Sequence, residues 1–115
     1  MGKPDFKFKL PIFGTDVIVL FFKNKRDDFI QYCQKTYGTI ENPEVILEDC
    51  PGMTCGAAIY LEDPMDMTIK AHEIDHLVSN ITDAKGIKDV ETRAYICGYI
   101  SDKIDKHLRK KGYYG

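Results

Sequence analysis

The sequence predicts an α+β fold in a single domain over residues 1–115, with a small, mainly antiparallel sheet and three helices. Short alternating or apolar runs typical of strands lie in the first half, whereas the second half holds two long segments with helical periodicity. A chain of 115 residues also leaves no room for a second hydrophobic core. The predicted order of elements is β-β-α-β-β-α-α.

An N-terminal hairpin is the first predicted unit. Residues 5–12 alternate apolar with mainly charged side chains, which is typical of a half-buried strand, and Pro11 favours a strand end or a sheet edge. Residues 13–16 form a predicted turn, and the apolar run over 17–22 is expected to return as the second strand.

A helix is predicted after the hairpin. Asp27 or Asp28 can cap its start, and Gly38 ends it after Tyr37. Its inner side is expected to consist of Phe29, Ile30, Cys33 and Tyr37.

Two short strands are predicted in the middle of the chain, over 44–48 and 56–61, with a turn bracketed by Cys50 and Cys55 between them. This cysteine pair is interpreted as structural, because a zinc site would need a second pair. The other two cysteines, Cys33 and Cys97, are expected on helices as small buried side chains.

Two helices are predicted in the second half. Asp66 is expected to cap a helix over 66–80, which residues 80–86 follow as a loop. Asp89 heads the last helix and Gly112 stops it. The apolar stripe predicted for this helix consists of Val90, Ala94, Cys97, Ile100 (or Ser101), Ile104 and Leu108.

The first of these helices contains an H-E-x-x-H arrangement, His-Glu-Ile-Asp-His at residues 72–76. One helical turn separates His72 from His76, so both imidazoles can reach a single zinc ion. Glu73 lies beside His72, placed to accept a proton from a metal-bound water. The motif therefore predicts two metal ligands and a general base, and a third ligand has to come from elsewhere.

The last helix carries the preferred third ligand, Glu91. This residue lies near the first turn beside the apolar stripe, and the small side chains of Ala94 and Gly98 would let the two helices approach closely. Asp89 and Asp83 compete with Glu91 for the same role.

His72-Glu73-x-x-His76 followed by Glu91-x-x-Ala94-Tyr95 resembles the gluzincin pattern, in which a glutamate on the next helix completes a zinc site. More narrowly, the second half of the chain resembles small zincin-like proteins encoded by phages and prophages, related to the ImmA/IrrE-type metallopeptidases. The resemblance implies a minimal zincin-like fold with a supporting helix, an HExxH helix and a C-terminal ligand helix. It also implies His72, His76 and Glu91 as ligands of one Zn²⁺ per chain, with Glu73 as the catalytic base.

Two features depart from the family pattern. Tyr95 stands where several related families carry Asp or Asn, and the gap between His76 and Glu91 is short. Tyr95 is interpreted as either an oxyanion donor or a core aromatic residue. In zincins an edge strand near the metal can hold an extended peptide, and residues 56–60 are the candidate here, although their small side chains equally suit ordinary packing beneath a helix. The candidates that would orient the histidines are Asp75, Asp83 and Asp102.

The expected activity is zinc-dependent hydrolysis of a peptide or protein substrate, in which Glu73 moves the proton of a metal-activated water. The same ligand set also suits non-haem iron. The alternative is a catalytically inactive zincin-fold interaction protein that binds a host or regulatory protein.

Charge and hydropathy argue against other classes of function. A net charge of −2 indicates no nucleic-acid partner, and the basic run over 107–111 is expected to favour a helix end. The longest apolar run, over 17–22, is far shorter than the ~20 residues of a spanning helix, so no membrane partner is expected. The N-terminus lacks a long apolar stretch, which predicts no signal peptide and a cytoplasmic location, that of the host bacterium if the protein is phage-encoded.

Overall fold

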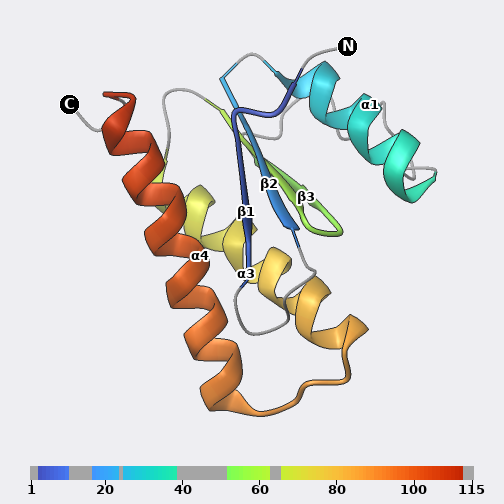
Figure 1. Ribbon diagram of the computed structural model, residues 1–115, viewed down its shortest axis with the longest axis vertical. Helices are drawn as coiled ribbons and strands as arrows, with labels where there is room; N and C mark the ends of the chain where they lie inside the picture. Colours follow the sequence, from blue (N-terminus) through green and yellow to red (C-terminus); the bar gives the residue numbers. More distant parts are fainter. Residues whose placement is uncertain (1–2, 11–16, 24, 39–51, 63–65, 113–115) are drawn as a thin grey trace.

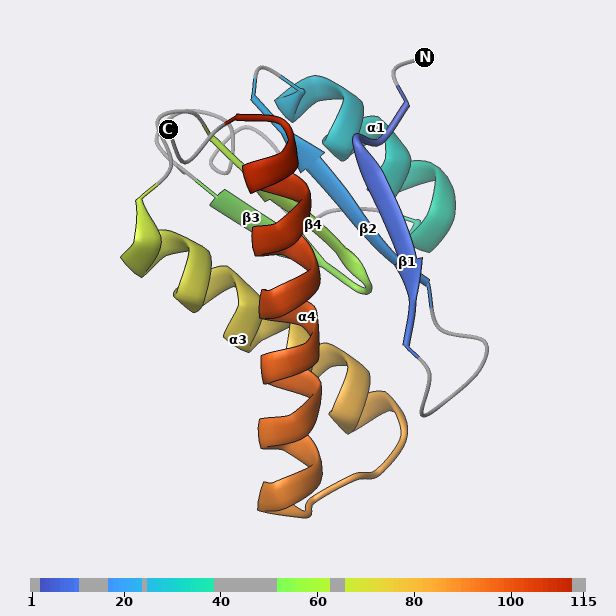
Figure 2. The ribbon, with the colours of Figure 1, turned by 60° about the vertical axis from the view of Figure 1, so that its left-hand side comes forward.

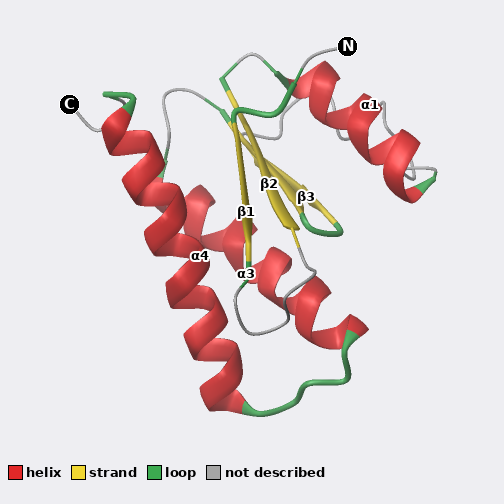
Figure 3. Ribbon diagram, viewed as in Figure 1, coloured by secondary structure: helices red, strands yellow, loops and turns green. Residues whose placement is uncertain are grey.

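Four strands form one sheet, and helices cover both of its faces (Figures 1 and 3). The computed structural model describes residues 3–10, 17–23, 25–38, 52–62 and 66–112. The strands are β1 (Phe6–Lys9), β2 (Val17–Phe22), β3 (Gly52–Cys55) and β4 (Ala58–Leu61). The helices are α1 (Arg26–Tyr37), α3 (Met67–Ala84) and α4 (Val90–Lys110). The described residues confirm the predicted α+β class; their elements follow the order β-β-α-β-β-α-α, but β3 consists of residues that the sequence does not predict as a strand.

The sheet is mixed, with the strand order β1-β2-β4-β3. The hairpin partners β1 and β2 are antiparallel, as predicted, and β3 and β4 are antiparallel too, but β2 and β4 run parallel. The predicted strand over 44–48 lies outside the described residues. The turn predicted over residues 50–55 is wrong for 52–55, which form β3. The chain turns instead at Gly56, whose φ of +55° lies in the left-handed region that glycine adopts readily.

One face of the sheet packs against α1. Successive side chains of a strand point to opposite faces, so alternate residues of β2 and β4 reach this helix. Gly38 ends α1 as predicted, with a φ of +94°, but Tyr37 is 46% exposed and does not belong to the inner side. The predicted cap by Asp27 or Asp28 is wrong, because Arg26 already begins the helix and both aspartates lie inside its first turn. The buried residues of this side are Val19, Phe21, Phe29, Ile30, Cys33, Met53, Ala58 and Tyr60.

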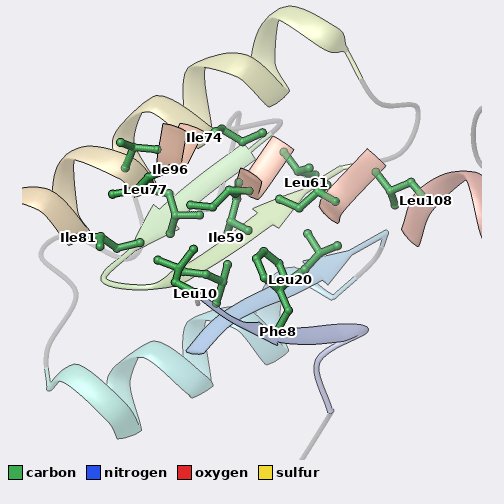
Figure 4. Packing of buried hydrophobic residues seen from close by; sticks show 14 of the residues in the cluster. Phe8, Leu10, Leu20, Ile59, Leu61, Ile74, Leu77, Ile81, Ile96 and Leu108 are labelled. Carbon is green, nitrogen blue, oxygen red and sulfur yellow. The ribbon is translucent and has the colours of Figure 1, made fainter. Parts of the chain in front are cut away.

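The opposite face packs against α3 and α4 and forms the larger part of the core. Figure 4 shows side chains from β1, β2, β4 and both helices meeting there. Lys70 joins the two helices by an ion pair with Asp105 at the rim of this core. The buried residues of this cluster are Phe8, Leu10, Ile18, Leu20, Phe22, Ile59, Leu61, Ile74, Leu77, Val78, Ile81, Ile96, Ile100, Ile104 and Leu108.

Carboxylate caps begin both of these helices, as predicted. Asp66 accepts hydrogen bonds from the backbone N–H groups of Thr68 and Ile69, at 2.7 and 3.3 Å. Asp89 accepts one from the N–H of Thr92 at 3.1 Å. In the described ranges, no helix has both the length and the hydropathy of a membrane span.

Helix α3 runs to Ala84, one turn beyond its predicted end. Ile81 and Thr82 are both buried, which extends the packed face of the helix. The Thr82 hydroxyl donates a hydrogen bond to the carbonyl of Val78 at 2.8 Å and accepts one from Arg93 at 2.6 Å. Contacts with α4 therefore hold residues that the sequence pattern assigns to a loop.

The apolar stripe of α4 differs from the predicted one. Its buried residues are Ile96, Ile100, Ile104 and Leu108, at strict four-residue spacing. Val90 is 74% exposed and Ala94 is exposed as well. Gly98 is also exposed, and a Cβ added there would meet nothing within 4 Å. The prediction that Ala94 and Gly98 form a close helix contact is therefore wrong, because this face of α4 turns away from α3.

Candidate metal centre

The two histidines of the motif converge on the exposed side of α3. The Nε2 atoms of His72 and His76 are 3.0 Å apart, and their rings are nearly perpendicular at 88°. Two nitrogen ligands at 2.0–2.1 Å from a tetrahedral zinc are themselves about 3.3–3.4 Å apart. In the structure the two ring nitrogens share a hydrogen bond, which a metal ion would replace, and the Nε2–Nε2 distance is a few tenths of an ångström below that of a zinc pair. Both residues are open to solvent.

Glu73 points away from solvent, toward the sheet. Its side chain belongs to the packed face of α3 and the residue is only 8% exposed. The Thr54 hydroxyl lies 2.8 Å from the Glu73 Oε1 atom and 3.0 Å from the Glu73 carbonyl oxygen, and its one hydrogen is shared between these two acceptors. The carboxylate is thus held by β3, whereas the neighbouring histidines face water.

A glycine in β3 permits this close packing of helix on strand. A Cβ added at Gly52 would lie 2.8 Å from the Cγ of Glu73 and 3.0 Å from the Cγ2 of Ile69. Any larger residue would push β3 away from α3 at the position of Glu73. The sequence does not predict the contacts of Gly52 and Thr54 with Glu73. Both residues lie in a segment predicted as a turn, and no local pattern links them to Glu73.

The edge strand beside the motif is β3, not the predicted segment over 56–60. Within the described part of the chain, β3 pairs only with β4, whereas β4 pairs with both β2 and β3. The prediction that residues 56–60 form the edge is therefore wrong. Figure 2 shows β3 at the border of the sheet that lies nearest to α3.

Glu91, the predicted third ligand, lies exposed in the first turn of α4. Arg93 of α4 contacts Thr82 near the end of α3. Along the helix pair, Glu91 lies two residues beyond this contact on α4, and His76 lies six residues before it on α3. At 1.5 Å per residue, about 12 Å separates Glu91 from His76 along the helix pair. Among the described residues, no group of three His, Cys, Asp or Glu side chains could hold a metal ion. The structure therefore brings His72 and His76 together, but not Glu91.

The competing third ligands and the orienting carboxylates are also spread over the surface. Asp89 is engaged as the cap of α4, and the hydrogen bonds from Thr92 lower the pKa of its carboxyl group. Asp102 forms an ion pair with Lys106 at 3.0 Å. Asp75 and Asp83 are exposed on α3. Each of these carboxylates therefore lies at the surface rather than in a packed site around the histidines.

Tyr95 is 53% exposed and stacks on Tyr99, with ring centroids 6.4 Å apart. This position contradicts the interpretation of Tyr95 as a core aromatic residue. The role of oxyanion donor stays a prediction.

The cysteines of the described segments are free thiols packed in the two cores. Cys33 is fully buried, as predicted, while Cys97 is partly buried. Burial raises the pKa of the Cys33 thiol, and the neighbouring Cys55 raises it further. Cys50 lies outside the described residues. Cys55 therefore packs against Cys33 of α1, a contact that its spacing from Cys50 does not indicate.

Comparison of the chain with models of protein families, with curated proteins and with solved structures found no match. The resemblance to gluzincins therefore depends on the motif residues His72, Glu73, His76 and Glu91-x-x-Ala94. The geometry of the site is what bears on its chemistry.

Proposed function

We propose that the protein is a zinc-dependent metallopeptidase-like protein in which His72 and His76 bind the metal and Glu73 is the general base. The observation that carries this proposal is the convergence of the two Nε2 atoms to 3.0 Å. When bound, zinc would lower the pKa of a coordinated water towards ~7 and polarise a peptide carbonyl group. This chemistry needs a base beside the metal and a surface that holds the peptide, and the chain has candidates for both.

Glu73 is suited to the role of base because its orientation is constrained. Thr54 donates to its Oε1 atom, which leaves Oε2 as the atom that would accept the proton and return it to the leaving amine. Among the described residues, β3 pairs on one side only, and this edge is the proposed surface for an extended peptide substrate, since a sheet edge can accept a further strand. Thr54 would thereby connect the substrate strand to the base.

Glu91 is the proposed third protein ligand, as the gluzincin resemblance implies. Its distance from His76 means that binding by Glu91 requires the first turn of α4 to approach α3. Val90 is exposed and adds little packing, so the contacts that oppose such a movement are the hydrogen bonds from Arg93 to Thr82 and Ser79. The other source of a third ligand would be an Asp or Glu of a partner protein, whose carboxylate would bind the metal ion held by the two histidines.

Metal content tests the site directly. The wild-type protein is expected to bind one zinc ion per chain, and His76→Ala should weaken zinc binding by at least about 100-fold, since even residues that only orient ligands contribute 10–100-fold. The measurement is elemental analysis after dialysis, followed by titration with a zinc indicator. His107→Ala is the matched control, because it removes the only histidine outside the motif. Equal zinc binding by both variants would refute the site, and Glu91→Ala then tests the third ligand separately.

A second candidate function is that of a metal-bearing interaction protein without turnover. The observation that favours it is the burial of Glu73 against Thr54, since a catalytic base has to reach water. The variant Glu73→Gln separates the two functions because it keeps the size and the hydrogen bond to Thr54 while removing the basic group.

For an enzyme, Glu73→Gln should lower the rate of peptide hydrolysis about 10²–10⁴-fold while the zinc content stays the same. The rate is measured with a fluorogenic peptide library on the zinc-loaded protein. A zinc-loaded wild type that cleaves none of the peptides would favour the interaction protein. An active Glu73→Gln variant would show that Glu73 is not the base.

A further inference from the structure

Two cysteines from different parts of the chain meet in the core between the sheet and α1. Cys33 lies in α1 and is fully buried, whereas Cys55, the last residue of β3, is partly buried and packs against the same cluster. Both are free thiols. They are close enough to interact, since burial raises the pKa of Cys33 and the neighbouring Cys55 raises it further. Tertiary packing alone therefore forms this pair.

A tyrosine one helical turn beyond Cys33 fixes the β3–β4 turn against α1. The Tyr37 hydroxyl accepts a hydrogen bond from the backbone N–H of Ala57 at 3.1 Å. A Cβ added at Gly56 would lie 2.5 Å from the Cζ of the Tyr37 ring, so the ring lies directly on the turn. Tyr37 shares a helix face with Cys33, and Gly56 directly follows Cys55. The contacts that hold the turn thus also hold the two thiols together.

The two thiols differ in their access to solvent. Cys33 is 0% exposed and its pKa is held well above the ordinary value, so its reactive thiolate form is scarce. Cys55 is partly exposed at the end of β3, and a small oxidant would therefore meet Cys55 first. A disulfide is easily reduced when the folded protein stabilises the thiolate that is released, and the surroundings of Cys33 do the reverse.

We propose that Cys33 and Cys55 are a redox pair, which forms a disulfide between α1 and β3 in the presence of glutathione disulfide. In the first step, the Cys55 thiolate attacks one sulfur of glutathione disulfide, so a bond between Cys55 and glutathione forms and one glutathione leaves as a thiolate. In the second step, the Cys33 thiolate attacks the Cys55 sulfur and the second glutathione leaves. The two departing thiolates take up the two protons that the protein thiols lose. Two protein thiols are thereby oxidised, and one glutathione disulfide is reduced to two glutathione thiols.

The disulfide ties the β3–β4 hairpin to α1. Thr54, the neighbour of Cys55 in β3, points to the opposite face of the sheet and hydrogen-bonds to Glu73 of α3. A cross-link on one face of β3 therefore restrains the strand that holds a buried carboxylate on the other face. This restraint does not depend on a bound metal, because it acts through the chain alone.

Peptide mapping of the full chain identifies the pairing. The protein is incubated with reduced and oxidised glutathione at defined ratios, its free thiols are alkylated, and the digested chain is analysed by mass spectrometry, while circular dichroism monitors the fold. The expected product is a linked pair of peptides that contain Cys33 and Cys55, which dithiothreitol separates. Two lasting free thiols, a lasting glutathione adduct, or a bond from either residue to Cys50 would overturn the proposal. So would a disulfide that forms only in samples that have lost their structure.

Thermal unfolding and hydrogen exchange measure the effect of the cross-link. The oxidised wild type should have a Tm at least about 5 °C above that of the reduced protein, because closing the loop between residues 33 and 55 restricts the unfolded chain. Hydrogen exchange of residues 52–61 should slow on oxidation. An unchanged Tm together with unchanged exchange in the oxidised wild type would refute the restraint on β3.

Two cysteine variants assign this effect to the pair. Cys55→Ser changes the more exposed partner and should abolish the rise in Tm. Cys97→Ser is the matched control, because Cys97 is also partly buried but packs against the core on the opposite face of the sheet, and it should keep the rise. A rise that persists in Cys55→Ser, or that is lost in Cys97→Ser, contradicts the proposed pair.

Discussion

Replacing Ile100 by alanine should lower the free energy of unfolding by about 2–5 kcal/mol. Ile100 is fully buried at the centre of the α4 stripe, where it packs between α3 and the sheet. The truncation removes apolar contacts and leaves a cavity that the two helices can fill only partly. Urea unfolding followed by circular dichroism measures the effect, and the slope of the transition should stay unchanged.

The matched control is Val90→Ala on the same helix. Val90 is 74% exposed, so this truncation should change the free energy of unfolding by less than about 0.5 kcal/mol. The pair tests the register of α4, because Val90 and Ile100 both belong to the stripe that the sequence predicts. If Val90→Ala lowered the free energy of unfolding as much as Ile100→Ala, α4 would be rotated about its axis relative to the structure.

The second large effect is expected at the ion pair that joins α3 to α4. Asp105→Ala removes a carboxylate that contacts Lys70, whose side chain is only 5% exposed. Removing one partner of a fully buried pair costs about 3–5 kcal/mol, and the partial exposure of Asp105 reduces the expected loss to about 2–4 kcal/mol. Thermal or urea unfolding measures it.

Removing the other partner of the pair should destabilise the protein much less. Lys70→Met keeps the aliphatic stem and removes the buried charge, while Asp105, whose side chain is 26% exposed, can still reach water. The expected loss of stability is below about 1 kcal/mol. If Lys70→Met and Asp105→Ala destabilise the protein equally, the asymmetry in burial does not govern this pair.

The starts of α3 and α4 and the ends of α1 and α4 could be predicted from the sequence because they depend on local signals. The start of α1 could not, since no side chain of the described residues caps it. Asp66 and Asp89 each cap N–H groups two or three residues ahead, and Gly38 and Gly112 both adopt the positive φ expected after a helix. Such interactions involve neighbours in the chain, so the residue types indicate them. The end of α3 could not be predicted, since its last turn depends on the contact between Thr82 and Arg93.

Within the candidate site, too, some features follow from local sequence and others depend on tertiary contacts. The spacing of His72 and His76 within one helix is enough to predict that their rings converge, because the helix repeat alone sets it. The burial of Glu73 depends on Thr54 and Gly52, about twenty residues earlier, which contact it only after β3 packs on α3. The distance of Glu91 similarly depends on how far α4 is displaced along α3.

By itself, the sequence determined the α+β class, the caps of α3 and α4, and the pairing of the two motif histidines. Only the tertiary structure decided that residues 52–55 form a strand, that this strand lies at the edge beside the motif, which face of α4 is buried, and that Phe6 stacks on His107. The physical reason is the range of the interactions. Caps and helical periodicity act over three or four residues, whereas strand order and helix packing depend on contacts between segments far apart in the chain.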